Sequence, residues 1–118
     1  MEQYEKMIDK IFSEFEDIRY AAFYIKGQLV HRQKQTIDLP SAMESDRYEE
    51  LLVNPTLITL AKQRGNIDCG GLRYIMISYG NFNQVIKELK GGHISLCFEL
   101  QCDPIPLLPI IFSFLEYS

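Results

Sequence analysis

The segment 72–102 constrains the fold more than any other part of this chain, because three strand-like runs follow one another there with only tight turns between them. The third run alternates apolar and polar side chains, as expected for a strand with one buried face. A meander of this kind uses most of its side chains for packing, so it indicates a fold and a way of pairing and does not indicate a reaction. In order, the runs and turns cover residues 72–79, 80–83, 84–90, 91–92 and 93–102.

The N-terminal part of the chain predicts a helix followed by a hairpin. Residues 2–16 carry apolar side chains at the spacing of an amphipathic helix. Residues 18–25 are rich in β-branched and aromatic side chains, and Lys26-Gly27 supplies a tight turn. Residues 28–34 carry several charges and few apolar side chains, which is typical of a strand at the edge of a sheet.

The middle of the chain predicts a loop over 36–46, after which helical patterning resumes. Asn54-Pro55 then interrupts the pattern, because proline lacks the N–H that a helix interior requires. Asn followed by proline is also a good helix start. The sequence therefore predicts one helical piece over 46–53 and another over 55–64, either separate or joined with a kink.

The last segment, 104–117, is strongly apolar and predicts a final helix whose regular part begins near Pro109. The predicted order is helix, strand, strand, helix, strand, strand, strand, helix. The compact solution for these elements is an α/β (α+β) fold, with a five-stranded antiparallel sheet and helices on both faces, in a single domain over 1–118.

Charge and composition narrow the class of partner. The net charge is −4, and the 12 basic residues are scattered, whereas nucleic-acid binding requires clustered Lys and Arg. No apolar stretch is long enough to span a membrane, and the polar, acidic start is not a signal peptide. Because there are 3 cysteines and no paired framework, a reducing compartment is the simplest interpretation, and a cytoplasmic location is expected.

No constellation of catalytic or metal-ligating residues emerges. His93 and Cys97 share one face of a strand, but Cys102 faces the other way. His31 lies on a different hairpin, so no metal site is predicted. Cys69 is the one thiol expected to be accessible, and it is interpreted as a loop cysteine and not as a nucleophile. The glycine pairs lack the spacing and following helix of a phosphate loop, so the sequence predicts no cofactor and no enzyme.

Glu99 is unusual because it lies between apolar residues in what should be a central strand. Two structural interpretations are open: a carboxylate at a partly exposed position of the sheet, or one paired with Arg19 or Arg73. A catalytic acid would require a second carboxylate or a pocket, and the sequence supplies neither.

Two stretches of the meander together resemble the second half of a roadblock domain, the dynein light chain roadblock-type family. The element order of the whole chain is also that of the family, since a leading helix distinguishes it from the related longin arrangement, which opens with strands. The stretches are Ile77-Ser78-Tyr79-Gly80-Asn81-Phe82-Asn83-Gln84-Val85-Ile86 and Gly91-Gly92-His93-Ile94-Ser95-Leu96-Cys97-Phe98-Glu99-Leu100.

The resemblance implies a small, non-enzymatic domain that forms homodimers or heterodimers by pairing its middle helix and the neighbouring strand across a two-fold axis. Such dimers serve as platforms or regulators for Ras-like small GTPases, or as adaptors in motor and signalling complexes. The implied partners are therefore a second copy or a paralogue, and a small GTPase. Asn54-Pro55 departs from the single long helix of the family, which bears on the dimer geometry. Carried onto this chain, the implied dimer interface consists of Leu57, Ile58, Leu60, Ala61, Arg73, Ile75, Ile77 and Tyr79.

The predicted strand 72–79 favours pairing for an independent reason. It follows a loop and is expected at the edge of the sheet opposite 28–34. It is apolar, with Arg73 as its one interior charge, and a bare apolar edge invites association. A symmetric partner is the common solution.

A second hypothesis is a small-molecule sensor of similar shape, with a ligand between the sheet and a helix. Ser78, Tyr79 and Glu99 are the nearest polar candidates for its site.

Overall fold

The computed structural model describes residues 2–34 and 43–116. They form five strands and four α-helices, with two short helical turns, in the order that the sequence predicts. The elements are α1 (Glu2–Glu14), β1 (Ile18–Ile25), β2 (Gln28–Gln33), α2 (Met43–Tyr48), the π-helical turn η1 (Glu49–Val53), α3 (Asn54–Asp68), β3 (Ile75–Ser78), β4 (Phe82–Leu89), β5 (Gly92–Glu99), the 3₁₀ turn η2 (Ile105–Leu107) and α4 (Leu108–Glu116).

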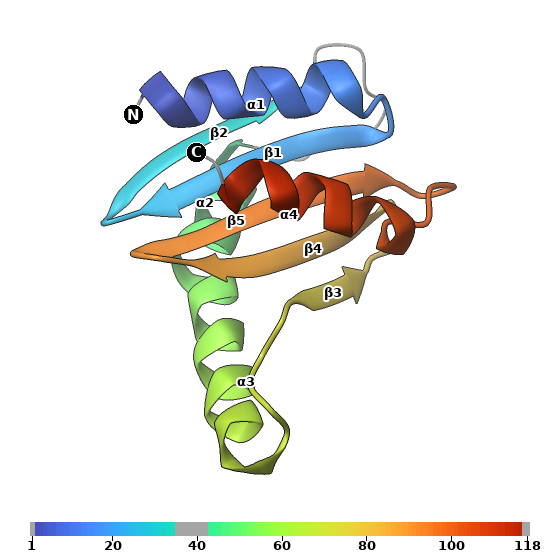
Figure 1. The fold of residues 1–118 in the computed structure, drawn as a ribbon. Coiled ribbons are helices and arrows are strands. Elements are labelled where there is room, and N and C mark those ends of the chain that lie inside the picture. Colours follow the sequence, from blue (N-terminus) through green and yellow to red (C-terminus); the bar gives the residue numbers. More distant parts are fainter. Residues whose placement is uncertain (1, 35–42, 117–118) are drawn as a thin grey trace.

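The strands form one antiparallel sheet in the order β2-β1-β5-β4-β3 (Figure 1). The predicted five-stranded antiparallel fold is therefore confirmed. β2 and β3 lie at opposite edges, as the sequence predicts for the runs 28–34 and 72–79. The outer side of β3 has no strand beside it among the described residues.

Helices α1 and α4 cover one face of the sheet, and α2, η1 and α3 lie behind the other (Figure 1). The α1–α4 side is the hydrophobic core, and it draws on both helices and on the inward positions of the three central strands. Alternation along each strand places its apolar side chains there. The core residues are Ile8, Ile11, Phe15, Ile18, Ala21, Phe23, Ile25, Val85, Ile94, Leu96, Phe98, Leu108 and Ile111.

The opposite face of the same strands is polar. The register pairs Gln84 with Cys97, and Tyr20 with both Cys97 and Gln33, so these side chains share the α2–α3 side. His93 and Ser95 follow by alternation along β5. We call the buried polar side chains on this side the polar layer: Tyr20, Gln84, His93, Ser95 and Cys97, with Glu50 and Asn54 from the covering helix.

Two tight turns fix the register of the sheet. Lys26 and Gly27 both have positive φ, 51° and 80°, as the predicted hairpin turn requires. The β4–β5 turn has Gly91 at φ 85°, and Gly92 begins β5. A Cβ atom on Gly92 would lie 1.7 Å from the carbonyl oxygen of Tyr24, so only glycine fits where β5 passes β1.

Of the two alternatives for the helical pieces 46–53 and 55–64, the structure has them joined, because helical backbone continues from Met43 to Asp68. The π turn η1 accommodates the proline: the N–H of Asn54 bonds to the carbonyl of Glu49, five residues back. In this widened turn the missing N–H of Pro55 interrupts the helix less than it would in a regular α-helix. Asn54 is helical and buried and is not an N-cap. Of the predicted loop 36–46, residues 43–46 are helical and the rest lies outside the described residues.

The first predicted strand of the meander is shorter than expected. β3 begins at Ile75 and not at residue 72, because Tyr74 turns towards α4, where its ring lies 6.2 Å from that of Phe112. β5 ends at Glu99, which leaves Leu100 53% exposed and outside the buried face predicted for it. The final helix agrees with the prediction, with an irregular first turn before α4.

Candidate functional site

A buried carboxylate, Glu50, organises the polar layer. It lies in η1, is 0% exposed, and accepts hydrogen bonds from three directions. The Tyr20 hydroxyl donates to Oε2 at 2.9 Å, and Asn54 Nδ2 donates to Oε1 at 2.8 Å. His93 Nε2 lies 2.8 Å from the same Oε1, so a proton on this nitrogen completes the set. A buried carboxylate without such donors would destabilise the fold strongly.

The π turn explains how Glu50 reaches this position. A widened turn changes which side chains point at the sheet, and here both Glu50 and Asn54, four residues apart, face it. Tyr20 comes from β1 and His93 from β5, so Glu50 joins the helix to two central strands. The hydrogen bonds therefore fix the position of the helix on the sheet.

Burial also sets the acid–base state of the groups around Glu50. It raises the pKa of the Tyr20 hydroxyl, and the negative charge of Glu50 raises it further, so Tyr20 remains a donor. Burial likewise raises the pKa of the Cys97 thiol well above its ordinary value, with Glu50 as the next cause. Cys97 is thus held as a protonated thiol, which is a poor nucleophile.

A pocket of about 380 Å³ opens beside this layer, between the α2–η1 segment and the β3–β4 turn. The described residues that line it include three carboxylates and three aromatic rings, and none of these described residues is Lys, Arg or His. Its lining residues are Tyr20, Ser45, Asp46, Glu49, Glu50, Tyr79, Gly80, Asn81, Phe82, Gln84 and Cys97. We call it the acidic pocket.

Glu49 and Tyr79 face each other across this pocket. The Tyr79 hydroxyl donates to Glu49 Oε1 at 3.5 Å, and the Tyr79 ring lies 5.4 Å from that of Phe82. Burial raises the pKa of Glu49, and the charge of Glu50 adds to this, while hydrogen bonds from Gln84 and Tyr79 oppose it. The pocket therefore holds a carboxylate whose charge is only partly compensated.

The structure answers the question of Glu99 by pairing it with Arg19, one of the two partners considered. Arg19 Nη1 lies 3.0 Å from Glu99 Oε1, and Arg19 is 5% exposed. Arg73, the other candidate, is exposed. Ser78, a proposed sensor residue with Glu99, is also exposed, whereas Tyr79 lines the acidic pocket.

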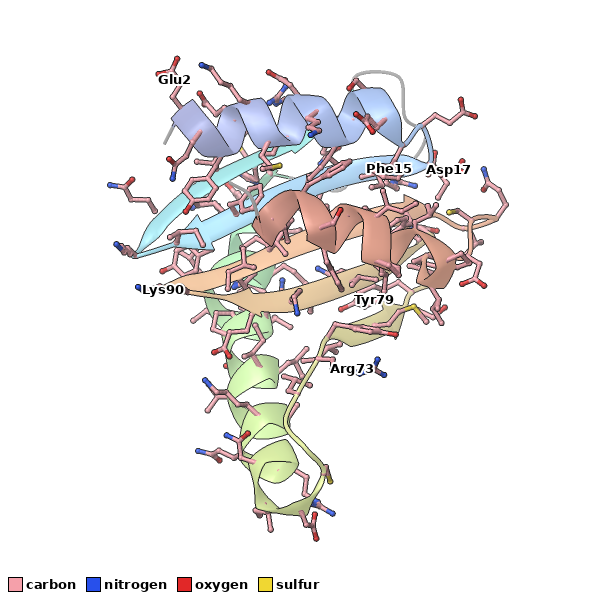
Figure 2. The ribbon with its side chains drawn as sticks, in the orientation of Figure 1. Glu2, Phe15, Asp17, Arg73, Tyr79 and Lys90 are labelled. Carbon is pink, nitrogen blue, oxygen red and sulfur yellow. The ribbon has the colours of Figure 1, made fainter. Side chains whose placement is uncertain are left out.

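The strand residues of the expected dimer interface are only partly brought together. Ile75 and Ile77 alternate onto the α3 side of β3 and are half-buried, and Tyr79 follows them at the end of the strand. Arg73 lies before the strand and lines a pocket of about 280 Å³ against α4. Figure 2 shows Arg73 and Tyr79 at opposite ends of β3.

The helix residues of the expected interface lie on different sides of α3. Ile58 is buried, Leu57 and Ala61 are half-buried, and Leu60 is 61% exposed. Leu60 does not share the buried side of Ile58, because α3 extends past the sheet edge and no element of the described residues covers its outer side (Figure 1). Exposed apolar side chains continue along this segment at Tyr48, Leu52 and Ile67.

Other chemistry is sparse among residues 2–34 and 43–116. No three His, Cys, Asp or Glu side chains there are arranged to hold a metal ion. Cys69 is exposed at the end of α3, and its thiol donates to Asp68 at 3.3 Å. No described helix is long and apolar enough to cross a membrane.

Comparison with known proteins finds a likeness in structure and none in sequence. No family model matches the sequence, and no curated protein matches it. Among solved structures, the chain is similar to one described as "MglB with tetrameric arrangement", with a TM-score of 0.65 over 93% of this chain and 82% of that chain. This likeness supports a roadblock-type fold for the chain. At 15% identity the likeness shows the fold alone, which agrees with the resemblance in the meander.

Sequence reasoning missed Glu50, the acidic pocket and the π turn. A carboxylate in a helix is ordinarily solvent-exposed, and nothing distinguishes Glu50 from Glu49 in the sequence. One signal was available: alternation places Tyr20, His93 and Ser95 on one sheet face, and a buried polar face requires hydrogen-bond partners.

Proposed function

We propose that this protein is a non-enzymatic interaction module that pairs with a second copy or a paralogue and scaffolds or regulates a Ras-like small GTPase or a signalling or motor complex. The pairing rests on one observation above all. β3 is an edge strand with half-buried Ile75 and Ile77 on its α3 side, and it has no strand beyond it among the described residues. Such an edge is normally covered or paired.

The projecting helix supports the same proposal. Leu60 is 61% exposed and Ile67 is 76% exposed on α3, which extends beyond the sheet (Figure 1). A two-fold pairing of β3 with its copy would bring two such helices near one another and bury apolar surface on both. The similarity of the fold to MglB in a tetrameric arrangement is compatible with self-association.

Light scattering at micromolar concentration tests the pairing. We expect about twice the 13.7 kDa of one chain. Ile75→Asp with Ile77→Asp should give a monomer, because like charges would meet across the axis. Met76→Asp places one negative charge on the opposite face of β3 and should remain dimeric. A wild-type monomer would contradict the proposal.

The small-GTPase part rests on the resemblance of 77–86 and 91–100 to roadblock domains. The wild-type protein and its monomeric variant can be used as bait in a native lysate, and the retained fractions assayed for guanine nucleotide. Enrichment by the wild type and not by the variant is expected. Equal nucleotide in both fractions would count against this part and leave the pairing intact.

A second candidate function is a small-molecule sensor, and the acidic pocket is the observation that favours it. Its volume of about 380 Å³ lies in the range of natural ligand sites, and it lies between a helix and the sheet, where the hypothesis expects a ligand. Mass spectrometry of protein released from a native preparation tests it: a stoichiometric small molecule is expected, and a clean chain after gentle purification would speak against it.

A further inference from the structure

The acidic pocket has a charge arrangement that selects a class of ligand, and this inference rests on the second candidate function. Asp46, Glu49 and Glu50 line it, and no Lys, Arg or His lines it in the part of the chain that the structure describes. The carboxylate oxygens of Glu50 already accept hydrogen bonds from Tyr20, Asn54 and His93. Glu50 therefore adds negative charge to the pocket but is not expected to accept a further hydrogen bond from a ligand. Glu49, which faces Tyr79 at the long distance of 3.5 Å, has the capacity to accept a stronger donor.

A buried amide supplies an independent reason to expect a donor. Gln84 is 1% exposed and lines the pocket. Its Nε2 donates to the Ser95 hydroxyl at 2.8 Å, but its Oε1 finds no hydrogen-bond partner among the described residues. A buried acceptor without a donor is costly and calls for a ligand or partner that brings one.

The aromatic side of the pocket already contacts one guanidinium. Arg19 lies with its guanidinium carbon 5.5 Å from the centre of the Phe82 ring, and its Nη1 donates to the Asn81 carbonyl at 3.4 Å. Both Phe82 and Asn81 line the pocket. Arg19 Nη1 also lies 3.0 Å from Glu99 Oε1, and neither residue of this ion pair is among the described residues that line the pocket. Rings and carbonyls of this kind favour cations.

The arrangement does not suit a metal ion. No three carboxylate, His or Cys groups converge within the part of the chain that the structure describes. Carboxylates spread along one wall, with aromatic rings on another, fit an extended cation whose charged group donates several hydrogen bonds and whose stem contacts rings.

We propose that the acidic pocket binds a small organic cation, a guanidinium or primary ammonium on a short apolar stem, with Glu49 as the charge partner and Phe82 and Tyr79 as the ring contacts. The carbonyl oxygen of Gln84 accepts from the same charged group. The carboxylate and the aromatic rings of the pocket favour a positively charged head that donates several hydrogen bonds. Neutral and anionic molecules of equal shape lack such a head.

The test uses the full chain and three probes of matched size: n-butylguanidinium, neutral n-butylurea and pentanoate. Amide chemical shifts are followed by NMR during titration. We expect butylguanidinium to shift the amides of 45–50 and 79–84, with butylurea and pentanoate much weaker. Glu49→Gln should weaken butylguanidinium about tenfold or more, which corresponds to one charge-assisted hydrogen bond.

Matched variants separate the site from general electrostatics. Glu44→Gln removes the same formal charge from an exposed position of α2 that does not line the pocket, and it should leave the affinity unchanged. Phe82→Leu keeps an apolar side chain but removes the ring, and it should weaken butylguanidinium several-fold. This variant also keeps the test usable if Glu49→Gln disturbs the fold.

Two results would overturn the inference in distinguishable ways. If butylurea or pentanoate shifts the same amides as strongly as butylguanidinium, the pocket takes ligands but not by charge, and the sensor function survives. If none of the three probes shifts these amides at millimolar concentration, the cation site and the ligand-binding function both fail. Equal weakening by Glu44→Gln and Glu49→Gln would show a long-range charge effect and no site.

Discussion

The two faces of the sheet are built on different principles although the same strands form both. On the α1–α4 side, β5 contributes Ile94, Leu96 and Phe98 to a core that is almost entirely apolar. One residue away along the same strand, His93 and Ser95 belong to a layer held by hydrogen bonds to Glu50 and Gln84. The apolar face is held by packing, which is not directional, whereas the polar face needs each donor opposite an acceptor.

The difference teaches what each face can tolerate. An apolar core accepts changes of side chain that conserve volume. A buried polar layer accepts little change, but it specifies one arrangement of its parts. Here the specified part is the α2–η1–α3 segment, which carries both the acidic pocket and the proposed pairing helix.

The largest expected effect comes from the apolar face. Leu96→Ala should lower the free energy of unfolding by about 3–4 kcal/mol, because Leu96 is 0% exposed and its removal leaves a cavity. Cys97→Ala, the next residue of β5 on the polar face, should cost only about 1 kcal/mol, since a small thiol is lost. Urea unfolding of both variants measures the difference. Equal losses would show that the two faces do not differ as described.

The next effect separates hydrogen-bond satisfaction from packing. Glu50→Ala should cost about 3 kcal/mol, because Tyr20, Asn54 and His93 would keep buried donors without an acceptor. Glu50→Gln keeps one acceptor oxygen and should cost about half as much. Thermal unfolding of the two variants provides the comparison. A Glu50→Ala variant as stable as the wild type would mean that Glu50 does not organise the layer.

A smaller effect of opposite sign is expected at Glu49. Its pKa is raised by burial first and by the charge of Glu50 second, so the folded state favours the protonated form. The stability that Glu49 contributes through its raised pKa is present below the ordinary pKa of Glu, about 4.3. It is lost as the pH rises through the pKa that Glu49 has in the folded protein. Glu49→Gln should therefore stabilise the protein at pH 7.5 by roughly 0.5–1 kcal/mol, after allowance for solvent screening, and by less at pH 4.

Calorimetry at the two pH values checks this prediction. A Glu49→Gln variant that is destabilised at pH 7.5, or whose gain grows towards pH 4, would contradict the cause assigned to the pKa.

The smallest expected change in stability comes from an exposed ion pair at the rim of the α1–α4 side. Arg32 Nη1 lies 2.5 Å from Asp9 Oδ1, and both side chains are substantially exposed. Asp9→Asn should change the free energy of unfolding by less than about 0.5 kcal/mol. Urea unfolding at low and high salt measures this change. If Asp9→Asn lost as much stability as Glu50→Gln, exposed ion pairs at the rim and buried hydrogen bonds in the polar layer would not differ in the way described.

Much of the fold could be predicted because its signals are local. The alternation in 93–100 and the charged run 28–34 indicated a buried central strand and an edge, and the structure has both. The two-residue turn at Lys26-Gly27 likewise depends on the conformation of two neighbouring residues. The pairing of Glu99 with Arg19 was one of the alternatives considered, since both lie at strand positions.

The site could not be predicted in the same way. Glu50 is 30 residues from Tyr20 and 43 from His93 along the chain, so only tertiary structure brings them together. The π turn has no signal of its own, because Asn54-Pro55 satisfies the rules for a helix start equally well. Leu60 and Ile58 differ in burial although both belong to the implied dimer interface, because the sequence cannot show where the sheet beneath the helix ends.

The π turn also has a consequence for aligning this chain with relatives. Relative to an α-helix, η1 accommodates one extra residue, and each residue of a helix advances the side-chain direction by about 100°. A relative with a regular helix here would carry a one-residue gap within 49–53, inside a helix and not in a loop. An alignment that moved the gap to the loop after α3 would shift every α3 position by one, and would compare Leu57 with the residue that truly corresponds to Ile58.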